Sequence, residues 1–163
     1  MPSTVFDSDI FRDAFGTEVM RAIFSDRATV ARYVEVEVAL AKVQGALGLV
    51  PAEAAAAIAA KSDASVLDLA KLKAETDLVG YPIVGVVHQL QKQCGEAGRY
   101  LHWGATTQDI IDTATVLQMR SALDLVGAEL DVIGTALADL TRKHLATVMA
   151  GRTHLQHALP VTF

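Results

Sequence analysis

The stretch of sequence that decides the fold is DIIDTATVLQMRSALDLVGAELDVIGTALADLTRKH, from Asp109 to His144. Apolar side chains recur in it at intervals of 4, 3, 4, 3, 4 and 3 residues, at Met119, Leu123, Val126, Leu130, Ile133, Leu137 and Leu140. This heptad spacing is typical of a helix that packs against other helices along one apolar seam. A single helix of this length extends ~54 Å at ~1.5 Å per residue. We expect it to need partner helices, because a globule of this chain length is only ~30 Å across.

The composition of the 163-residue chain also favours packed helices over a sheet, since alanine supplies 27 residues and aromatic residues only 6%. Apolar residues make up 52% and charged residues 20%, which argues against a disordered chain. The formal net charge of −5 argues against nucleic-acid binding, because no basic surface would neutralise phosphates. The single cysteine, Cys94, excludes an internal disulfide and a cysteine-rich zinc site.

The sequence also contains information about targeting signals, membrane spans and the nature of its C-terminus. The N-terminus has acidic residues and lacks the basic start of a signal peptide. The longest uncharged segment in the middle of the chain, Leu78 to Gln91, is too short and too polar to span a bilayer. We therefore expect a cytoplasmic protein with no membrane partner. Phe163 closes an apolar stretch with no charged tail, so we also expect the chain to be part of a longer protein.

Four shorter helices are expected before the long one. Capping residues, prolines and glycines mark their ends. The expected helices run from Ser25 or Asp26 to about Leu47, from Pro51 to Lys61, from Val66 to Lys73 and from Pro82 to Gly95 or Gly98. The polar segment Glu75 to Tyr81 is expected to be a loop, as is Gly104 to Thr107. These patterns assign the chain to the all-α class.

The most suggestive ionisable side chain is His154, in the segment Gly-Arg-Thr-His-Leu-Gln. A histidine can donate or accept a proton near neutral pH, and Arg152 can bind a carboxylate through two parallel hydrogen bonds. The alternative interpretation is a solvated surface loop. His154 and His157 would share a face on a helix, but no third ligand lies nearby, so we expect no metal site. His88 and His144 fall within expected helices and are interpreted as structural.

A second candidate is the segment Gly-Ala-Thr-Thr-Gln-Asp, which contains Thr106, Thr107 and Gln108. Hydroxyl and amide groups at a helix N-terminus form a site for a carboxylate or a phosphate, because free N–H groups and the helix dipole both favour an anion. The alternative is ordinary helix capping by Thr106 or its neighbours. His102 and Trp103 precede the segment, where they either line a pocket or form a partly buried pair.

Two segments of the chain resemble signatures of the fumarase/aspartase superfamily. Residues 102–113, His-Trp-Gly-Ala-Thr-Thr-Gln-Asp-Ile-Ile-Asp-Thr, are similar to the first signature. Residues 151–162, Gly-Arg-Thr-His-Leu-Gln-His-Ala-Leu-Pro-Val-Thr, are similar to the second. Segments 20–26, 34–41 and 47–51 resemble the N-terminal helices of the same superfamily. The resemblance covers essentially the whole chain and corresponds to the first third of such an enzyme.

The resemblance implies an N-terminal helical domain at residues 1–104, followed at 105–163 by the first long helix of a central helix bundle. It implies a homotetramer whose active sites are built from different subunits. It also implies an anti addition or elimination beside a carboxylate, with a small dicarboxylate or tricarboxylate as substrate. No cofactor and no metal are implied. The catalytic base of the superfamily lies on a Gly-Ser-Ser loop that this sequence does not contain.

The resemblance further implies roles for individual residues. Thr153 and His154 would lie at the leaving group, with His154 as proton donor or relay. Hydroxyl and amide donors are needed because the reaction passes through an aci-carboxylate, whose negative charge must be stabilised. The residues implied to bind or support the substrate are His102, Thr106, Thr107, Gln108, Arg152 and Gln156.

Two branches of the superfamily compete. Residues 106–113 and the Gly80-Tyr-Pro segment are most similar to 3-carboxy-cis,cis-muconate cycloisomerase, which is the activity we expect. Adenylosuccinate lyase has a histidine in the loop after Glu-Thr, whereas Asp77 follows here. His154 supports the alternative of a C–N or C–O dicarboxylate lyase, adenylosuccinate lyase included, because cycloisomerases of this branch often lack that histidine. The non-enzyme alternative is a helical oligomerisation module.

Overall fold

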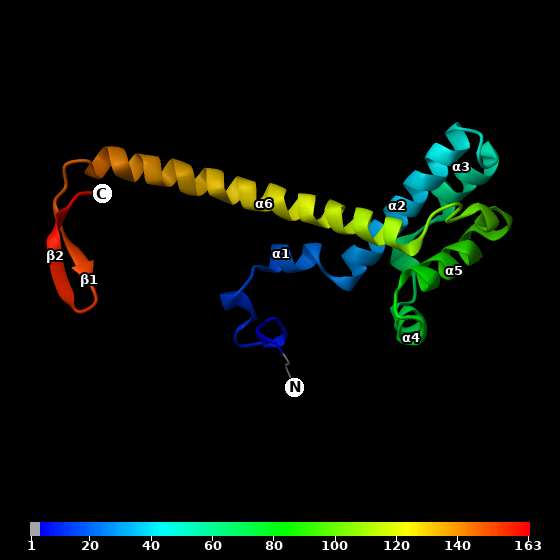
Figure 1. The fold of residues 1–163 in the computed structure, drawn as a ribbon, viewed down its shortest axis with the longest axis horizontal. Coiled ribbons are helices and arrows are strands. Elements are labelled where there is room, and N and C mark those ends of the chain that lie inside the picture. Colours follow the sequence, from blue (N-terminus) through cyan, green and yellow to red (C-terminus); the bar gives the residue numbers. More distant parts are fainter. Residues whose placement is uncertain (1–3) are drawn as a thin grey trace. The chain divides into compact units, whose positions relative to one another are not determined.

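The computed structural model describes residues 4–163, and within them it contains six α-helices, four 3-10 helices and one two-stranded sheet (Figure 1). The α-helices are α1 (Glu18–Ile23), α2 (Asp26–Ala46), α3 (Ala52–Lys61), α4 (Leu69–Val79), α5 (Ile83–Cys94) and α6 (Thr107–His144). The 3-10 helices are η1 (Val5–Asp7), η2 (Arg12–Ala14), η3 (Ala64–Val66) and η4 (Gly95–Tyr100). The strands are β1 (Met149–Thr153) and β2 (Gln156–Val161). The all-α prediction and the long helix are confirmed.

The chain divides into two compact units, Met1–Ala122 and Leu123–Phe163, and the division falls inside α6. We call them the N-terminal unit and the C-terminal unit. No helix within residues 4–163 combines the length and the hydropathy that a membrane span requires.

Local capping explains where the helices of the N-terminal unit begin and end. The Ser25 hydroxyl accepts a hydrogen bond from the Ala28 N–H at 3.3 Å, which fixes the start of α2 as expected. Gly48 follows the end of α2 at a φ of +72°, a conformation that glycine adopts without strain. Pro51 is the N-cap of α3 rather than its first helical residue, and Pro82 is the N-cap of α5.

One sequence-based prediction is wrong, because residues 75–79 belong to α4 and do not form a loop. The Asp68 carboxylate accepts hydrogen bonds from the N–H groups of Ala70 and Lys71, so α4 starts later than expected. Lys73 and Asp77, one helical turn apart, form an ion pair that stabilises the polar end of the helix. The helix ends at Gly80, whose φ of +95° closes the C-terminus.

The core of the N-terminal unit is built from α2, α3, α5 and the first turns of α6. Its most deeply buried side chains are Ile58, Leu67, Ile83, Leu90, Ile110, Glu37, Val86 and Cys94. Helices α2 and α3 approach closely at Gly45, where a Cβ atom would lie only 2.5 Å from the Cβ of Ala55. This core fixes α2, α5 and the start of α6 relative to one another, and these are the elements that carry the candidate site.

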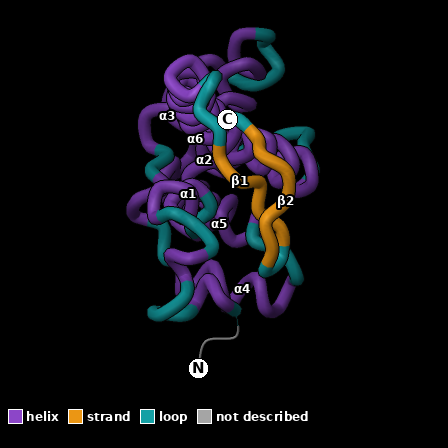
Figure 2. Tube along the Cα trace, turned by 90° about the vertical axis from the view of Figure 1, so that its left-hand side faces the viewer, coloured by secondary structure: helices purple, strands orange, loops and turns teal. Residues whose placement is uncertain are grey.

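The C-terminal unit consists of the second half of α6 and a β-hairpin. Strands β1 and β2, orange in Figure 2, are antiparallel. Arg152 lies opposite His157, and Thr153 lies opposite Gln156. The sequence pattern does not predict these strands. None of the residues in this unit is buried. The heptad residues Leu123, Val126, Leu130, Ile133, Leu137 and Leu140 are between 41% and 66% exposed, and we refer to them as the α6 seam.

Candidate active site

The first group of candidate residues lies at the start of α6. Thr106 precedes the first helical residue, and its hydroxyl accepts a hydrogen bond from the Gln108 N–H at 3.3 Å. The Asp109 carboxylate accepts a hydrogen bond from the Thr106 N–H at 2.8 Å, which completes a reciprocal cap. The capping interpretation of this segment is therefore confirmed for Thr106. The Thr107 hydroxyl has no hydrogen-bond partner among the described residues and remains available for a ligand.

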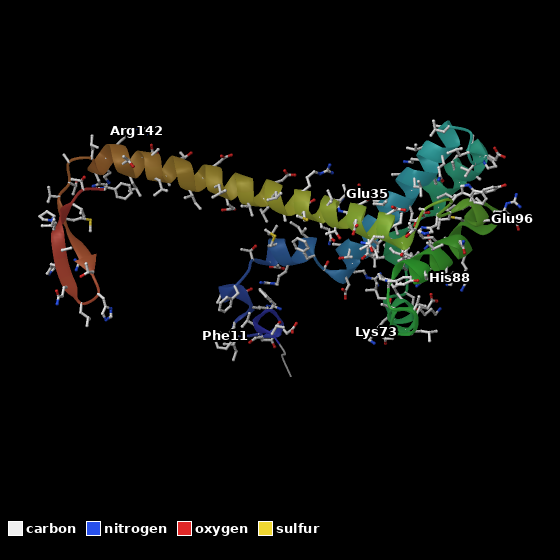
Figure 3. All side chains as sticks on the ribbon, viewed as in Figure 1. Phe11, Glu35, Lys73, His88, Glu96 and Arg142 are labelled. Atoms are coloured by element: carbon white, nitrogen blue, oxygen red, sulfur yellow. The ribbon has the colours of Figure 1, made fainter. Side chains whose placement is uncertain are left out.

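Thr107 and His102 both line a surface groove of about 220 Å³, which agrees with the interpretation that His102 lines a pocket. The groove is lined by Ile83, Val84, Val87, His88, Gln91, His102 and Thr107. His88 and Gln91 come from α5 and were not among the residues expected at the site. The His88 side chain (labelled in Figure 3) lies 3.3 Å from a carboxylate oxygen of Glu75, measured from its Nδ1 atom. The groove thus combines an apolar wall with two imidazoles, a hydroxyl and an amide.

The His102 side chain contacts a buried carboxylate on α2. Its Nδ1 atom lies 2.5 Å from Oε1 of Glu37, whose side chain is fully buried. Burial raises the pKa of the Glu37 carboxyl above its ordinary value, and hydrogen bonding and charge from His102 act in the opposite direction. The second carboxylate oxygen, Oε2, is buried and has no hydrogen-bond partner within residues 4–163. The sequence reasoning missed Glu37.

A sequence signal for Glu37 did exist. The buried face of α2 carries Val30, Val34 and Ala41 at helical spacing, and Glu37 occupies the same face. A charged residue on an apolar stripe is rarely buried unless it has a partner. That partner lies 65 residues further along the chain, at His102, so sequence spacing alone could not name it.

The second group of candidate residues lies on the β-hairpin of the C-terminal unit. His154 and Leu155 form the two-residue turn between β1 and β2, and Leu155 has a φ of +62°. The Thr153 hydroxyl donates a hydrogen bond to the Gln156 carbonyl at 3.2 Å across the base of this turn. Arg152, Thr153, His154 and Gln156 are all exposed. The turn therefore presents a hydroxyl, an imidazole and a guanidinium to the surroundings.

His154 and His157 do not share a helix face, because the segment is a hairpin and not a helix. No group of three or more metal-binding side chains is found within residues 4–163. The candidate residues therefore form two groups, one in each unit, and each offers hydrogen-bond donors and imidazoles.

A family model described as a lyase matches residues 14–163 of the chain. The chain belongs to this lyase family, part of the fumarase/aspartase superfamily. The predicted family resemblance is thereby confirmed.

Several relatives of this lyase-family chain match it along nearly its whole length. An N-acetyl-S-(2-succino)cysteine lyase from Dickeya dadantii is 42% identical over 100% of this chain and 36% of its own. A crystal structure of a fumarate lyase from Mesorhizobium sp. BNC1 has 53% identity and a TM-score of 0.83, covering 91% of this chain and 35% of that one. The 3-carboxy-cis,cis-muconate lactonizing enzyme from Pseudomonas putida has 41% identity and a TM-score of 0.88, covering 95% and 36%. The chain thus spans about a third of the length of these lyase-family relatives.

Proposed function

We propose that the complete protein catalyses an anti addition or elimination at a carbon next to a carboxylate, on a small dicarboxylate or tricarboxylate. The observation that carries this proposal is the groove at the start of α6, where His102 and Thr107 meet in a chain of the lyase family. Elimination beside a carboxylate builds negative charge on that carboxylate in the transition state. Hydrogen-bond donors directed at this charge, here the Thr107 hydroxyl and the N–H groups at the start of α6, lower the barrier more than they stabilise the bound substrate.

The first group of residues is suited to binding the substrate carboxylate. The free N–H groups and the positive end of the α6 dipole favour an anion at this point. Thr107 adds a hydroxyl that has no hydrogen-bond partner in the described part of the chain. The Gln108 amide currently donates to Asp112 at 2.5 Å and can exchange that exposed partner for a substrate oxygen. Thr106 both caps the helix and borders the anion site.

The second group of residues is suited to proton transfer at the leaving group. His154 sits at an exposed two-residue turn, where its imidazole can approach a bound ligand. We assign it as the proton donor or relay, with Thr153 beside it. Arg152 and Gln156 flank the turn and support the substrate, Arg152 by pairing with a carboxylate. The catalytic base is supplied by a part of the protein outside these residues.

The α6 seam supports a homotetramer as the active form. An exposed apolar stripe of this length is covered by other helices in stable proteins. In this proposal residues 1–104 form an N-terminal helical domain and residues 105–163 begin a central helix bundle. Active sites at the bundle then combine residues from different subunits, so the two groups of one chain serve different sites.

Within this reaction class we propose a cycloisomerase that acts on 3-carboxy-cis,cis-muconate. The Pseudomonas putida lactonizing enzyme, named for this activity, is 41% identical over 95% of this chain, which supports this assignment. His154 favours a second candidate, a C–N, C–O or C–S lyase that acts on a succinyl compound, since a departing heteroatom needs a proton. The succinocysteine lyase from Dickeya dadantii belongs to that class by name.

Steady-state kinetics of the complete protein test the reaction class and the site together. The substrates are 3-carboxy-cis,cis-muconate, adenylosuccinate and N-acetyl-S-(2-succino)cysteine, and turnover of one of them is the expected outcome. His154→Ala and Thr107→Ala should each lower kcat/KM by about 100-fold or more, as loss of an acid/base group or of a transition-state donor does.

Two control variants remove the same groups elsewhere. Thr115→Ala removes an exposed hydroxyl that donates a hydrogen bond within α6, to the Ile111 carbonyl at 2.8 Å. His144→Ala removes an imidazole at the end of α6. Both should stay within about twofold of wild type, as surface substitutions away from a site do. A loss below threefold for both His154→Ala and Thr107→Ala contradicts the site assignment. Absence of turnover on every substrate favours the oligomerisation module.

A further inference from the structure

A buried carboxylate that belongs to neither signature holds one ring nitrogen of His102. Glu37 lies in the middle of α2 with its side chain fully buried, and its Oε1 atom is 2.5 Å from Nδ1 of His102. The His102 side chain is 19% exposed, so the pair runs from the core to the surface groove. Burying a charged group is costly unless it gains a partner, and an apolar residue would fill the same place at lower cost. The pairing therefore calls for a role beyond packing.

The backbone around His102 is held in an uncommon conformation. His102 has a φ of +59°, in the left-handed region that residues with a Cβ atom rarely adopt. One heptad after Glu37 on the same buried face of α2, the Gln44 amide donates to the Trp103 carbonyl at 2.6 Å. Two polar side chains of α2 thus fix consecutive residues of the turn that leads into α6. Conformations of this kind persist where the surroundings enforce them, often beside functional groups.

The other ring nitrogen of His102 is free to act in the groove. Nε2 has no hydrogen-bond partner within residues 4–163, and it is not among their buried unpartnered atoms, so it is open to solvent. His102 lines the groove together with Thr107. Because Nδ1 faces the Glu37 carboxylate, a proton on Nδ1 satisfies that contact and leaves the Nε2 lone pair directed outward.

We propose that Glu37 is a positioning residue that keeps His102 in the Nδ1–H tautomer, so that Nε2 meets the substrate as a hydrogen-bond or proton acceptor. This proposal rests on the proposed function for the identity of the substrate, a small carboxylic acid. It adds a residue outside both signature segments to the site. Because Oε2 of Glu37 has no hydrogen-bond partner among the described residues, the contact with His102 is the one side-chain hydrogen bond that this buried group makes there.

The first test is Glu37→Gln in the complete protein. Glutamine keeps the size of the side chain but removes the charge, and its amide can either donate to or accept from Nδ1. We expect kcat/KM to fall by about 10-fold to 100-fold, the loss typical of groups that orient a functional imidazole. Glu35→Gln is the matched control, since Glu35 (labelled in Figure 3) lies on the same helix and is exposed. Its ion pair within residues 4–163 is with Arg32, at 2.6 Å. The control should stay within about twofold.

A double-variant cycle separates positioning from general loss of structure. If Glu37 acts through His102, then Glu37→Gln has little further effect, within about twofold, in a protein that already carries His102→Gln. A full additional loss in the double variant overturns the proposal. A Glu37→Gln variant with the kcat/KM of wild type overturns the proposal as well, while leaving the proposed reaction intact.

A spectroscopic measurement decides the tautomer without any turnover. Solid-state NMR of ¹⁵N-histidine-labelled complete protein distinguishes a protonated from an unprotonated ring nitrogen, and His102→Gln assigns the signal. We expect protonated Nδ1 and unprotonated Nε2 in wild type, and a mixed or reversed pattern in Glu37→Gln. An unprotonated Nδ1 in wild type overturns the proposal even if the Glu37 variants fail to fold. If no substrate is turned over, this spectrum still gives the answer for Glu37.

Discussion

Both halves of α6 carry apolar residues at helical spacing, yet only the first half buries them. In the N-terminal unit Ile110 is 1% exposed and Ala114 is 0% exposed. In the C-terminal unit Leu130 and Ile133, on the same helix, are 59% and 51% exposed. The difference does not lie in the chemistry of the side chains. It lies in whether the chain itself supplies a surface to pack against.

The first half of α6 contacts α2 and the end of α1. The buried Gln118 amide donates to the Ile23 carbonyl at 2.8 Å and to the Thr29 hydroxyl at 3.0 Å. Arg32 donates to the Ser121 hydroxyl at 3.1 Å. These contacts join residues about 90 positions apart, so they depend on the tertiary fold. The second half of the helix has a regular heptad instead, which is the pattern for packing against helices of other segments or subunits.

The largest effect is expected from removing a side chain of the closed core. Leu90 is 0% exposed, and Leu90→Ala should lower the free energy of unfolding of the N-terminal unit by about 3 kcal/mol, through lost burial and an unfilled cavity. Urea denaturation of the 163-residue chain, followed by the fluorescence of its single tryptophan, Trp103, measures the change. Leu78→Ala is the control, because Leu78 is 86% exposed and its loss should cost less than about 0.5 kcal/mol. Equal midpoints for both variants would contradict the described core.

The next effect is expected on the α6 seam. We expect the 163-residue chain to self-associate, because the seam is otherwise exposed to water. Ile133→Glu places a charge on the seam and should weaken association by about 100-fold or more, which corresponds to about 2.7 kcal/mol. Sedimentation velocity across a concentration series measures the shift.

Val132→Glu is the matched control for the seam. Val132 is the neighbouring β-branched residue, is 65% exposed, and lies off the heptad. Its substitution should leave the association constant within about threefold, as substitutions at exposed positions generally do. A wild-type chain that is a stable monomer at all concentrations would show that the apolar stripe of α6 is not an interface.

Local signals allowed most of the helices to be predicted from the sequence. Caps at Ser25 and Pro82 and the glycine at Gly48 act within one or two turns, so their effect is visible in the residues nearby. The heptad predicted α6 for the same reason. The end of α4 was missed because Glu75 and Asp77 have the polarity of a loop. Their stabilising partners, His88 and Lys73, become apparent only once the helix has formed.

The residues of the candidate site also fall into those that a local sequence pattern indicates and those that depend on tertiary packing. The signature segments gave Thr107 and His154 as candidates, because hydroxyl and imidazole groups in those patterns point to anion binding and proton transfer. His88 was interpreted as structural, and the contribution of α5 to the groove depends on packing that no local pattern encodes. The hairpin around His154 was not predicted, since Met149–Thr153 shows no alternation of apolar and polar residues. Glu37 is the clearest case, because its position on an apolar stripe was visible and its partner was not.

The smallest effect is expected from removing the cap at the start of α6, an interaction that the second half of the helix lacks at Asp124. The first turn of the helix is closed by the Asp109 carboxylate, which accepts from the Thr106 N–H at 2.8 Å. Asp109→Ala leaves that N–H without its partner and removes a negative charge from the positive end of the helix dipole. We expect the free energy of unfolding to fall by about 1 kcal/mol. Urea denaturation detected at Trp103, three residues before this cap, reports the change directly.

Asp124→Ala makes the same substitution in the second half of α6. Asp124 has no hydrogen bond or ion pair among the residues that the structure describes, and alanine has the higher helix propensity. The control should therefore be neutral or slightly stabilising, by a few tenths of a kcal/mol. If the two substitutions have equal effects, the reciprocal cap contributes nothing, and the start of α6 is held by the buried Ile110 and Ala114 alone. If Asp109→Ala costs more, the cap also fixes the first-turn N–H groups that the proposed carboxylate site requires.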